Sequence, residues 1–335
     1  MPFMKPHSQS FAICLLCVLY TSMLCAQTKQ KLMVQSSVDK SLQPCYIIVP
    51  DGYDASDSTV YPVLMALHTW SNSVEQNNAD WENEAYKRGW IYVFPHFRGP
   101  NNRPEACGSK IAQQDILDAL SYVKANYHAD EQRIYLAGVS GGGHMTMLMA
   151  SRHPQYWTAA SAWVGISDLK KWHDKHAKTK YGAMMRASCG GAPGDNMTVD
   201  RQYKERSPIH FLANSKRVPL DIAAGIHDGH TGSVPISHSL EAFNVIAKSV
   251  NAEPVSDQEI QQLSMPQGRL KAPLISDQIV DSSLGRDIHL RRYASQSRVT
   301  IFEGGHEGIA AAAFNWLARF YTNRAGNNVQ VDESK

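Results

Sequence analysis

The feature that most constrains this sequence of 335 residues is an alternation of short apolar runs with longer helix-period segments between about residues 60 and 325. The apolar runs have strand length and are almost continuously hydrophobic, which is typical of strands covered on both faces. Regular alternation of this kind predicts an α/β fold with a mostly parallel, doubly wound sheet and helices on both faces. The expected strands are 62–67, 90–95, 133–138, 158–164, 219–225 and 298–303.

Five further segments carry a helical period, and they are 80–88, 111–126, 142–152, 233–250 and 308–321. Two short apolar runs, 31–35 and 45–50, predict an antiparallel edge at the N-terminal side of the sheet. We interpret residues 27–335 as one domain, with its core at about 60–325. Two polar stretches, 168–218 and 252–286, interrupt the rhythm and are expected to be excursions, the first forming a lid or pocket wall.

The first 26 residues are expected to be a secretory signal peptide. Lys5 supplies a positive charge, residues 11–24 are apolar, and Cys25-Ala26 offers a cleavage site. The apolar stretch is shorter than the roughly 20 residues that a membrane helix needs, so no membrane span is expected after cleavage. Leu24 stands where a lipoprotein signal would carry a small residue, which argues against lipidation. The prediction is a secreted or periplasmic protein.

The charge balance bears on which partners the protein binds, and the cysteines bear on whether it forms a disulfide. Lys and Arg total 33 against 31 Asp and Glu, with no basic run that would follow a phosphate backbone, so no nucleic-acid partner is expected. Cys45, Cys107 and Cys189 remain after cleavage. Cys45 lies in a strand-like run, whereas Cys107 and Cys189 lie in Gly-rich loops and are predicted to form a disulfide. The oligomeric state is left open.

A catalytic motif follows the expected strand 133–138. Residues 138–142 read Gly-Val-Ser-Gly-Gly and lead directly into a helical segment. A G-x-S-x-G sequence at a strand-to-helix junction is the pattern of a nucleophile elbow, where a tight turn exposes the serine above the sheet. The sequence therefore predicts that Ser140 is a nucleophile.

An acid and a base follow Ser140 in the chain order of hydrolases. Asp228 comes just after strand 219–225, and His306 comes just after strand 298–303. Sites in open α/β sheets form at the carboxyl ends of strands, so Asp228 is expected to orient His306, and His306 to accept the Ser140 proton. Asp168 also follows a strand and is the alternative acid.

The oxyanion hole is expected at the end of strand 62–67. There, the backbone N–H of Thr69 or Trp70 would act beside that of Gly141. His68 is expected to support this loop or to line the substrate site. Trp163 and Trp172, with Trp70, are candidates for stacking on sugar rings, although such residues more often belong to the core.

Other polar clusters have weaker interpretations. His227, Asp228, His230 and His238 could suggest a metal, but no HExxH helix accompanies them, so neither a metal nor a cofactor is expected. His173 and His176 are interpreted as part of a solvated helix face.

The segments LMALHTW, RIYLAGVSGGG, GIHD with Val234-Pro235, and FEGGHEG resemble the catalytic domain of the α/β-hydrolase superfamily. The likeness is to the prolyl-oligopeptidase-like branch, which includes secreted acetylxylan and feruloyl-type esterases, and it covers about residues 60–325. Members of the branch typically have Asp-x-x-Val-Pro after the seventh strand, whereas here Val234 lies six positions after Asp228, and the longer segment contains Gly229-His230-Thr231-Gly232. Its peptidases also carry a β-propeller, for which the roughly 35 residues before the core leave no room.

These observations predict a secreted serine carboxylesterase that forms an acyl-enzyme, acting on small-molecule or polysaccharide esters, carbohydrate acyl esters included. A serine peptidase that uses the same residues is the first alternative. A catalytically silent binding protein on a hydrolase scaffold is the second.

Overall fold

The computed structural model describes Met1 and residues 29–323 and 329–332. The expected signal peptide therefore lies outside the described residues. The chain forms a nine-stranded sheet in the order β1-β2-β4-β3-β5-β6-β7-β9-β8. Its strands are β1 (Lys29–Gln35), β2 (Leu42–Ile48), β3 (Tyr61–Leu67), β4 (Ile91–Pro95), β5 (Ala129–Val139), β6 (Ala159–Trp163), β7 (Leu220–Gly225), β8 (Ile288–Ala294) and β9 (Ser297–Phe302).

Six central strands, β4-β3-β5-β6-β7-β9, run parallel, as the apolar runs predicted. β1 and β2 add the expected antiparallel edge. The antiparallel strand β8 closes the other edge and was not predicted, because its sequence IHLRRYA lacks a continuous apolar run. A short hairpin joins β10 (Phe320–Thr322) to β11 (Val329–Val331).

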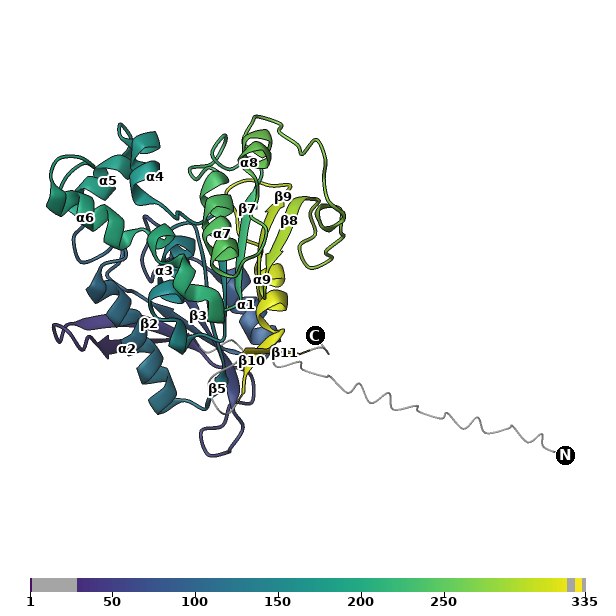
Figure 1. The fold of residues 1–335 in the computed structure, drawn as a ribbon. Coiled ribbons are helices and arrows are strands. Elements are labelled where there is room, and N and C mark those ends of the chain that lie inside the picture. The colour runs from purple at the N-terminus through teal and green to yellow at the C-terminus, as the bar shows by residue number, and fades with distance from the viewer. Residues whose placement is uncertain (2–28, 324–328, 333–335) are drawn as a thin grey trace.

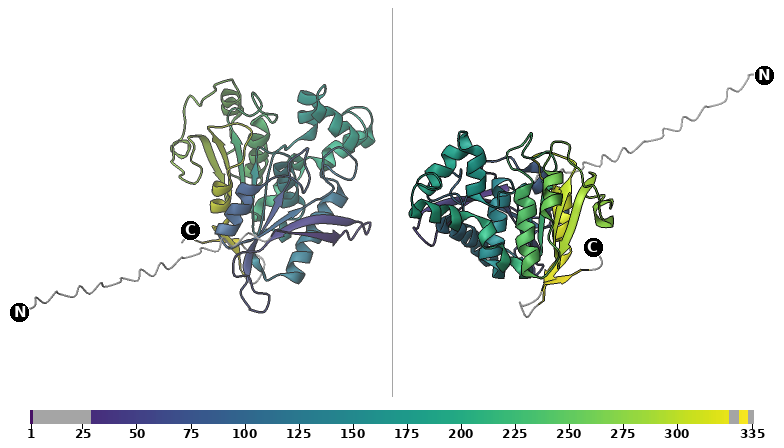
Figure 2. Two further views of the ribbon diagram at one scale, coloured as in Figure 1. Left: turned by 180° about the vertical axis from the view of Figure 1, so that it is seen from behind. Right: turned by 45° about the horizontal axis from the view of Figure 1, so that its top comes forward.

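Helices cover both faces of the sheet, as Figures 1 and 2 show. On one face α1 (Ala79–Lys87) packs against α9 (Ala310–Leu317) through Trp81 and Phe314. The other face carries α2 (Lys110–Asn126), α3 (Gly141–Arg152) and α7 (Ser237–Ser249). Strands β3, β4 and β6 are buried almost throughout, which explains their unbroken apolar sequences. The mostly parallel α/β prediction is confirmed.

The stretch 168–218, expected to be polar and broken, is mainly helical. It contains α4 (Leu169–His176), α5 (Lys180–Cys189) and α6 (Met197–Arg206), followed by the 3-10 turns η2 (Pro208–His210) and η3 (Leu212–Arg217). We call α4, α5 and α6 the cap; they lie together at the upper left of Figure 1. A small apolar cluster, separate from the main core, fixes the cap to the sheet through Trp70, Ile166, Trp172, Met185 and Val234.

The second excursion, 252–286, contains α8 (Asp257–Leu263) and the 3-10 turn η4 (Ile275–Asp277). Ser256 caps α8 and Glu259 returns the contact, a capping box that fixes the first turn of this short helix. A last 3-10 turn, η1 (Pro154–Tyr156), follows α3.

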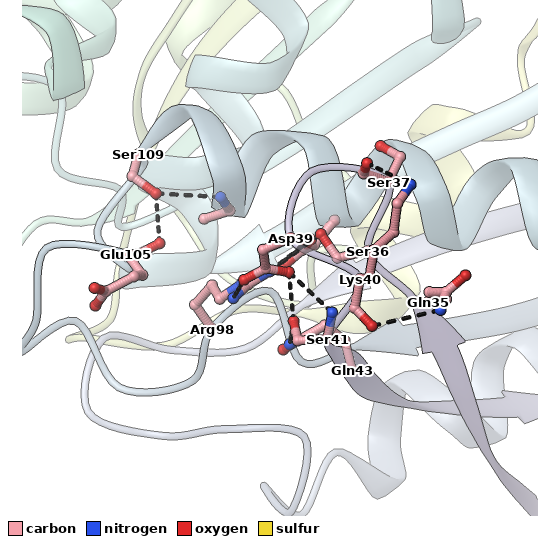
Figure 3. A network of polar contacts seen from close by, with 12 residues as sticks. Gln35, Ser36, Ser37, Asp39, Lys40, Ser41, Gln43, Arg98, Glu105 and Ser109 are labelled. Carbon is pink, nitrogen blue, oxygen red and sulfur yellow. Dashed lines mark hydrogen bonds and ion pairs between the residues drawn. The ribbon is translucent and has the colours of Figure 1, made fainter.

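A buried arginine holds the loop 97–108 against the N-terminal edge of the sheet. The Arg98 guanidinium donates to Asp39 at 2.8 Å and to Ser36 at 3.1 Å, both in the β1–β2 turn, and it also pairs with Asp115 of α2. Figure 3 shows Arg98 reaching into this turn. Hydrogen bonding from Arg98 lowers the pKa of Asp39 well below its usual range. One side chain thus connects three segments that are distant in sequence.

We expect Arg98→Met to lower the free energy of unfolding by about 3 kcal/mol, because it leaves the Asp115 carboxylate buried without its cation. Asp39→Asn should cost less, since the Asp39 side chain is 40% exposed. Urea unfolding of the two variants measures the difference. Equal losses would contradict the assignment of the buried pair as the stronger contact.

Candidate active site

Ser140 occupies a strained turn between β5 and α3. Its backbone has φ 60° and ψ −115°, a conformation that residues other than glycine rarely adopt. Two hydrogen bonds hold the turn: the Ser140 N–H donates to the Trp163 carbonyl at 2.8 Å, and the Ser140 carbonyl accepts from the His144 N–H at 2.9 Å. The geometry is that of the nucleophile elbow expected from the sequence.

Asp228 and His306 meet at the ends of neighbouring parallel strands. Asp228 follows β7 and His306 follows β9, and the Asp228 Oδ2 lies 2.7 Å from the His306 Nδ1. The Asp228 side chain is fully buried, and its Oδ1 accepts from the N–H groups of Gly229 at 2.9 Å and Val234 at 3.0 Å. Because a carboxylate only accepts, the proton of a neutral His306 ring stands on Nδ1, which leaves Nε2 free to accept another.

The loop that carries His306 lies against the elbow. A Cβ added to Gly308 would lie 2.5 Å from Val139 Cγ2, and Val139 immediately precedes Ser140. The loops after β5, β7 and β9 therefore converge at one edge of the sheet, as the carboxyl ends of parallel strands require.

The alternative acid is engaged elsewhere. The Asp168 Oδ1 accepts from the Lys171 N–H at 3.1 Å and caps the N-terminus of α4. The histidines considered for a metal also have separate partners: His227 contacts Glu303 at 2.6 Å, and the buried His238 contacts Ser167. Among residues 29–323 and 329–332, no group of three His, Cys, Asp or Glu side chains could hold a metal ion.

Of the three candidate oxyanion donors, Gly141 and Trp70 are the two whose backbone N–H groups lie together. The Thr69 N–H donates to the Gln76 Oε1 at 2.9 Å, so it points away from the site. A Cβ on Gly141 would lie 2.4 Å from the Trp70 nitrogen, which places these two backbone groups side by side. The Trp70 carbonyl, in the next peptide group of this loop, accepts from the Asn101 N–H at 3.0 Å and anchors the loop beside Trp70. Neither Gln76 nor Asn101 had a signal in the sequence, because both act through contacts made only in the folded chain.

The aromatic candidates for substrate stacking are buried, so this prediction is wrong. Trp163 donates its indole N–H to Ser161 Oγ at 2.8 Å within the sheet, and Trp172 donates to the Ser233 carbonyl at 2.9 Å. Both side chains, with that of Trp70, are at most 2% exposed. His68 is likewise buried, stacked on Phe97 at 3.8 Å, and supports its loop. Large rings at strand ends serve here to join layers of the fold.

Two further expectations are corrected. Cys107 and Cys189 are both free and buried rather than joined in a disulfide. Burial raises the pKa of Cys107 to about 11, which suppresses the thiolate that disulfide exchange needs. His173 and His176 are buried and not solvated. His173 packs on Tyr203 within the cap, and His176 Nε2 lies 2.7 Å from the Ser233 carbonyl, in the turn after Asp228.

The longer segment between Asp228 and Val234, with three residues more than Asp-x-x-Val, forms a turn and does not displace Asp228 from His306. The N–H groups of His230 and Thr231 both donate to the His227 carbonyl at 3.1 Å. A Cβ on Gly232 would lie 2.2 Å from the Asp228 Oδ1 and 2.7 Å from the His306 Cβ. The absence of a side chain at Gly232 lets the turn fold back over the acid and the base.

Comparison with known proteins agrees with this geometry. The model of the prolyl oligopeptidase family matches residues 77–257, more than half of the chain. The chain belongs to the prolyl oligopeptidase family.

Similar proteins include feruloyl esterase B of Talaromyces stipitatus. It is 24% identical over 235 residues, which cover 67% of this chain and 57% of that protein. Feruloyl esterase B of Neurospora crassa is 38% identical over 133 residues, 36% of this chain and 44% of that protein. The chain spans about half the length of these relatives. The acylaminoacyl peptidase of Pyrococcus horikoshii has the same fold, with a TM-score of 0.55 at 19% identity over 69% of this chain and 36% of that one.

Three fully buried histidines surround the site of this family member. Burial lowers the pKa of His68 and of His144 to about 4 and that of His238 to about 3. His144 Nε2 lies 2.7 Å from the Arg206 carbonyl, so this ring links α3 to the end of α6. The native structure therefore holds three neutral imidazoles at pH values where exposed histidines carry a charge.

We expect the free energy of unfolding to fall as the pH drops from about 6.5 to about 4. In that window the unfolded chain binds protons on these imidazoles and the folded chain does not, so acid favours unfolding by ~1.4 kcal/mol per pH unit for each histidine. Urea unfolding at several pH values measures the slope. His144→Gln keeps a donor and should remove one histidine's share; an unchanged slope would contradict the neutral, buried state of His144.

Proposed function

We propose that this protein is an exported serine carboxylesterase that acts on acyl esters of carbohydrates, with Ser140 as nucleophile, His306 as base and Asp228 as acid. The observation that carries the proposal is the 2.7 Å contact between Asp228 and His306 at the sheet edge where the strained Ser140 turn also stands. Membership of the prolyl oligopeptidase family supports hydrolytic chemistry. The feruloyl esterase relatives support an ester as the bond that is cleaved.

The proposal assigns each step of acyl transfer to a named group. Ser140 Oγ forms a bond to the ester carbonyl carbon while His306 Nε2 takes its proton, and Asp228 stabilises the resulting imidazolium. The N–H groups of Gly141 and Trp70 donate to the oxygen that becomes negative. His306 then returns the proton to the departing alcohol. Water attacks the acyl-enzyme by the same route, releases the acid and restores Ser140.

A serine peptidase is the second candidate. It is favoured by the family match and by the similarity to acylamino-acid-releasing enzyme 2 of Oryza sativa, 26% identical over 203 residues, which cover 55% of this chain and 25% of that protein. The same residues would then transfer the acyl group of an amide, with the harder departure of an amine.

We expect a fluorophosphonate probe to label the wild-type protein and to fail on Ser140→Ala, because the probe reports an activated serine. Asp228→Asn should lower kcat by about three to four orders of magnitude, since an amide favours the wrong His306 tautomer. Asp168→Asn is the matched control: asparagine caps a helix as well as aspartate does, so activity should persist.

Acetyl and feruloyl esters of sugars, simple methyl esters and peptide amides form the substrate panel. Labelling that survives Ser140→Ala would refute the nucleophile. Greater damage from Asp168→Asn would make Asp168 the acid, and faster amide than ester turnover would favour the peptidase.

Export is the other part of the proposal, and it rests on the apolar, charge-flanked N-terminal sequence. Within the described residues, none of the helices is long and apolar enough to cross a membrane. We expect the exported protein to begin at Gln27, which N-terminal sequencing of material from the periplasm or culture medium measures. An intact Met1 in that material would contradict cleavage.

A further inference from the structure

We propose that the cap positions the catalytic acid through a single peptide group, Ser233–Val234, with Trp172 and His176 as positioning residues. This inference rests on the proposed role of Asp228. It concerns residues 229–233, which we call the acid turn because they follow Asp228, and helix α4, which contacts this turn.

One side of the Ser233–Val234 peptide belongs to the cap. The Ser233 carbonyl accepts two hydrogen bonds from α4, one from Trp172 Nε1 at 2.9 Å and one from His176 Nε2 at 2.7 Å. Since a carbonyl cannot donate, His176 carries a proton on Nε2, and both lone pairs of the Ser233 oxygen are used. The two donor side chains, Trp172 and His176, are buried, which limits competition from water on the donor side.

The other side of the same peptide belongs to the acid. The Val234 N–H donates to the Asp228 Oδ1 at 3.0 Å, and the other oxygen of that carboxylate contacts His306 at 2.7 Å. Hydrogen bonds to a carbonyl polarise the N–H of the same peptide group and strengthen what that N–H donates. A continuous chain of hydrogen bonds therefore runs from α4 to the imidazole of His306.

Helix α4 makes a second contact at the start of the turn. The Gly229 carbonyl accepts from Lys175 Nζ at 2.6 Å, and the Gly229 N–H, which belongs to the preceding peptide group, donates to the same Asp228 Oδ1 at 2.9 Å. Both backbone donors to Asp228 thus come from a turn that α4 holds at its two ends. The extra residues of the turn form the surface on which the cap docks.

Trp172 also reaches the oxyanion side of the site. Its ring packs edge to face on the Trp70 ring, with the centroids 4.7 Å apart, and the Trp70 N–H is one of the two oxyanion donors assigned above. Helix α4 therefore contacts both the acid turn and the oxyanion loop, so a shift of the cap would disturb two parts of the catalytic group together.

The test removes the side-chain N–H donors of Trp172 and His176 and puts apolar side chains in their place. We expect Trp172→Phe with His176→Leu to lower kcat on an acetyl ester about tenfold with KM changed less than about twofold, because the acid is misplaced and substrate binding is not. The acidic limb of the kcat/KM profile should move to lower pH, since a displaced carboxylate stabilises the imidazolium less. His176→Gln, which keeps an N–H donor, should restore most of the loss that His176→Leu causes alone.

Tyr181→Phe is the matched control, because Tyr181 packs on both Trp172 and His176 within the cap and has no contact with the turn among the hydrogen bonds of the described residues. It should leave kcat and the pH profile unchanged. The single variants should shift the unfolding midpoint by only about 2–4 °C each, so they remain usable if the double variant does not fold.

Wild-type kcat and an unmoved acidic limb in both Trp172→Phe and His176→Leu would overturn the proposal. So would equal losses in Tyr181→Phe. A wild-type protein that neither reacts with fluorophosphonate nor turns over esters would instead refute the proposed function. The far-downfield proton resonance of His306 Nδ1–H gives a direct measure of the hydrogen-bond chain. It should move upfield in Trp172→Phe and in His176→Leu and stay in place in Tyr181→Phe.

Discussion

The strained turn at Ser140 is the constraint on which the rest of the site depends. A serine at φ 60° costs on the order of 1–3 kcal/mol relative to a relaxed backbone, so the surrounding structure must hold it. The Trp163 carbonyl at the end of β6 accepts from the Ser140 N–H, and helix α3 begins at once with glycines that allow close approach. Strand β6 and helix α3 thus fix the position of the proposed nucleophile. The other groups of the proposed site must therefore lie on segments that reach Ser140.

The parallel sheet explains how segments distant in sequence reach the Ser140 turn. Strands β5, β7 and β9 end at the same edge, so loops separated by many residues converge there with little freedom. This is also why the sequence could place Ser140, Asp228 and His306 at the same edge of the sheet, where they are proposed to act together. Their positions follow from strand ends, and strand ends follow from apolar runs that need no knowledge of tertiary contacts.

Sequence patterns failed where a contact between distant segments decides the outcome. The sequence does not tell whether the N–H of Thr69 or that of Trp70 faces the site. The fold distinguishes them, because the Thr69 N–H donates to Gln76. The sequence does not tell whether the indole rings of Trp163 and Trp172 face a sugar or the core; in the fold their N–H groups donate to Ser161 and Ser233. Strand β8 was missed because its adjacent residues Arg291 and Arg292 interrupt the apolar pattern, and they pair with acids in the second excursion, as Arg291 does with Asp281.

The cap and the acid turn are best understood as one unit. A turn with three residues more than Asp-x-x-Val, next to the proposed acid, would by itself loosen the backbone that supplies the hydrogen bonds of Asp228, because added loop residues bring conformational freedom. Here the Gly229 carbonyl of that turn is bound by Lys175, and the Ser233 carbonyl by Trp172 and His176, which limits this freedom. Either element alone would be unfavourable: the turn without the cap would leave Asp228 poorly held, and the cap without the turn would leave buried indole and imidazole donors without acceptors. The cap and the turn therefore depend on each other, and the proposed catalytic acid depends on both.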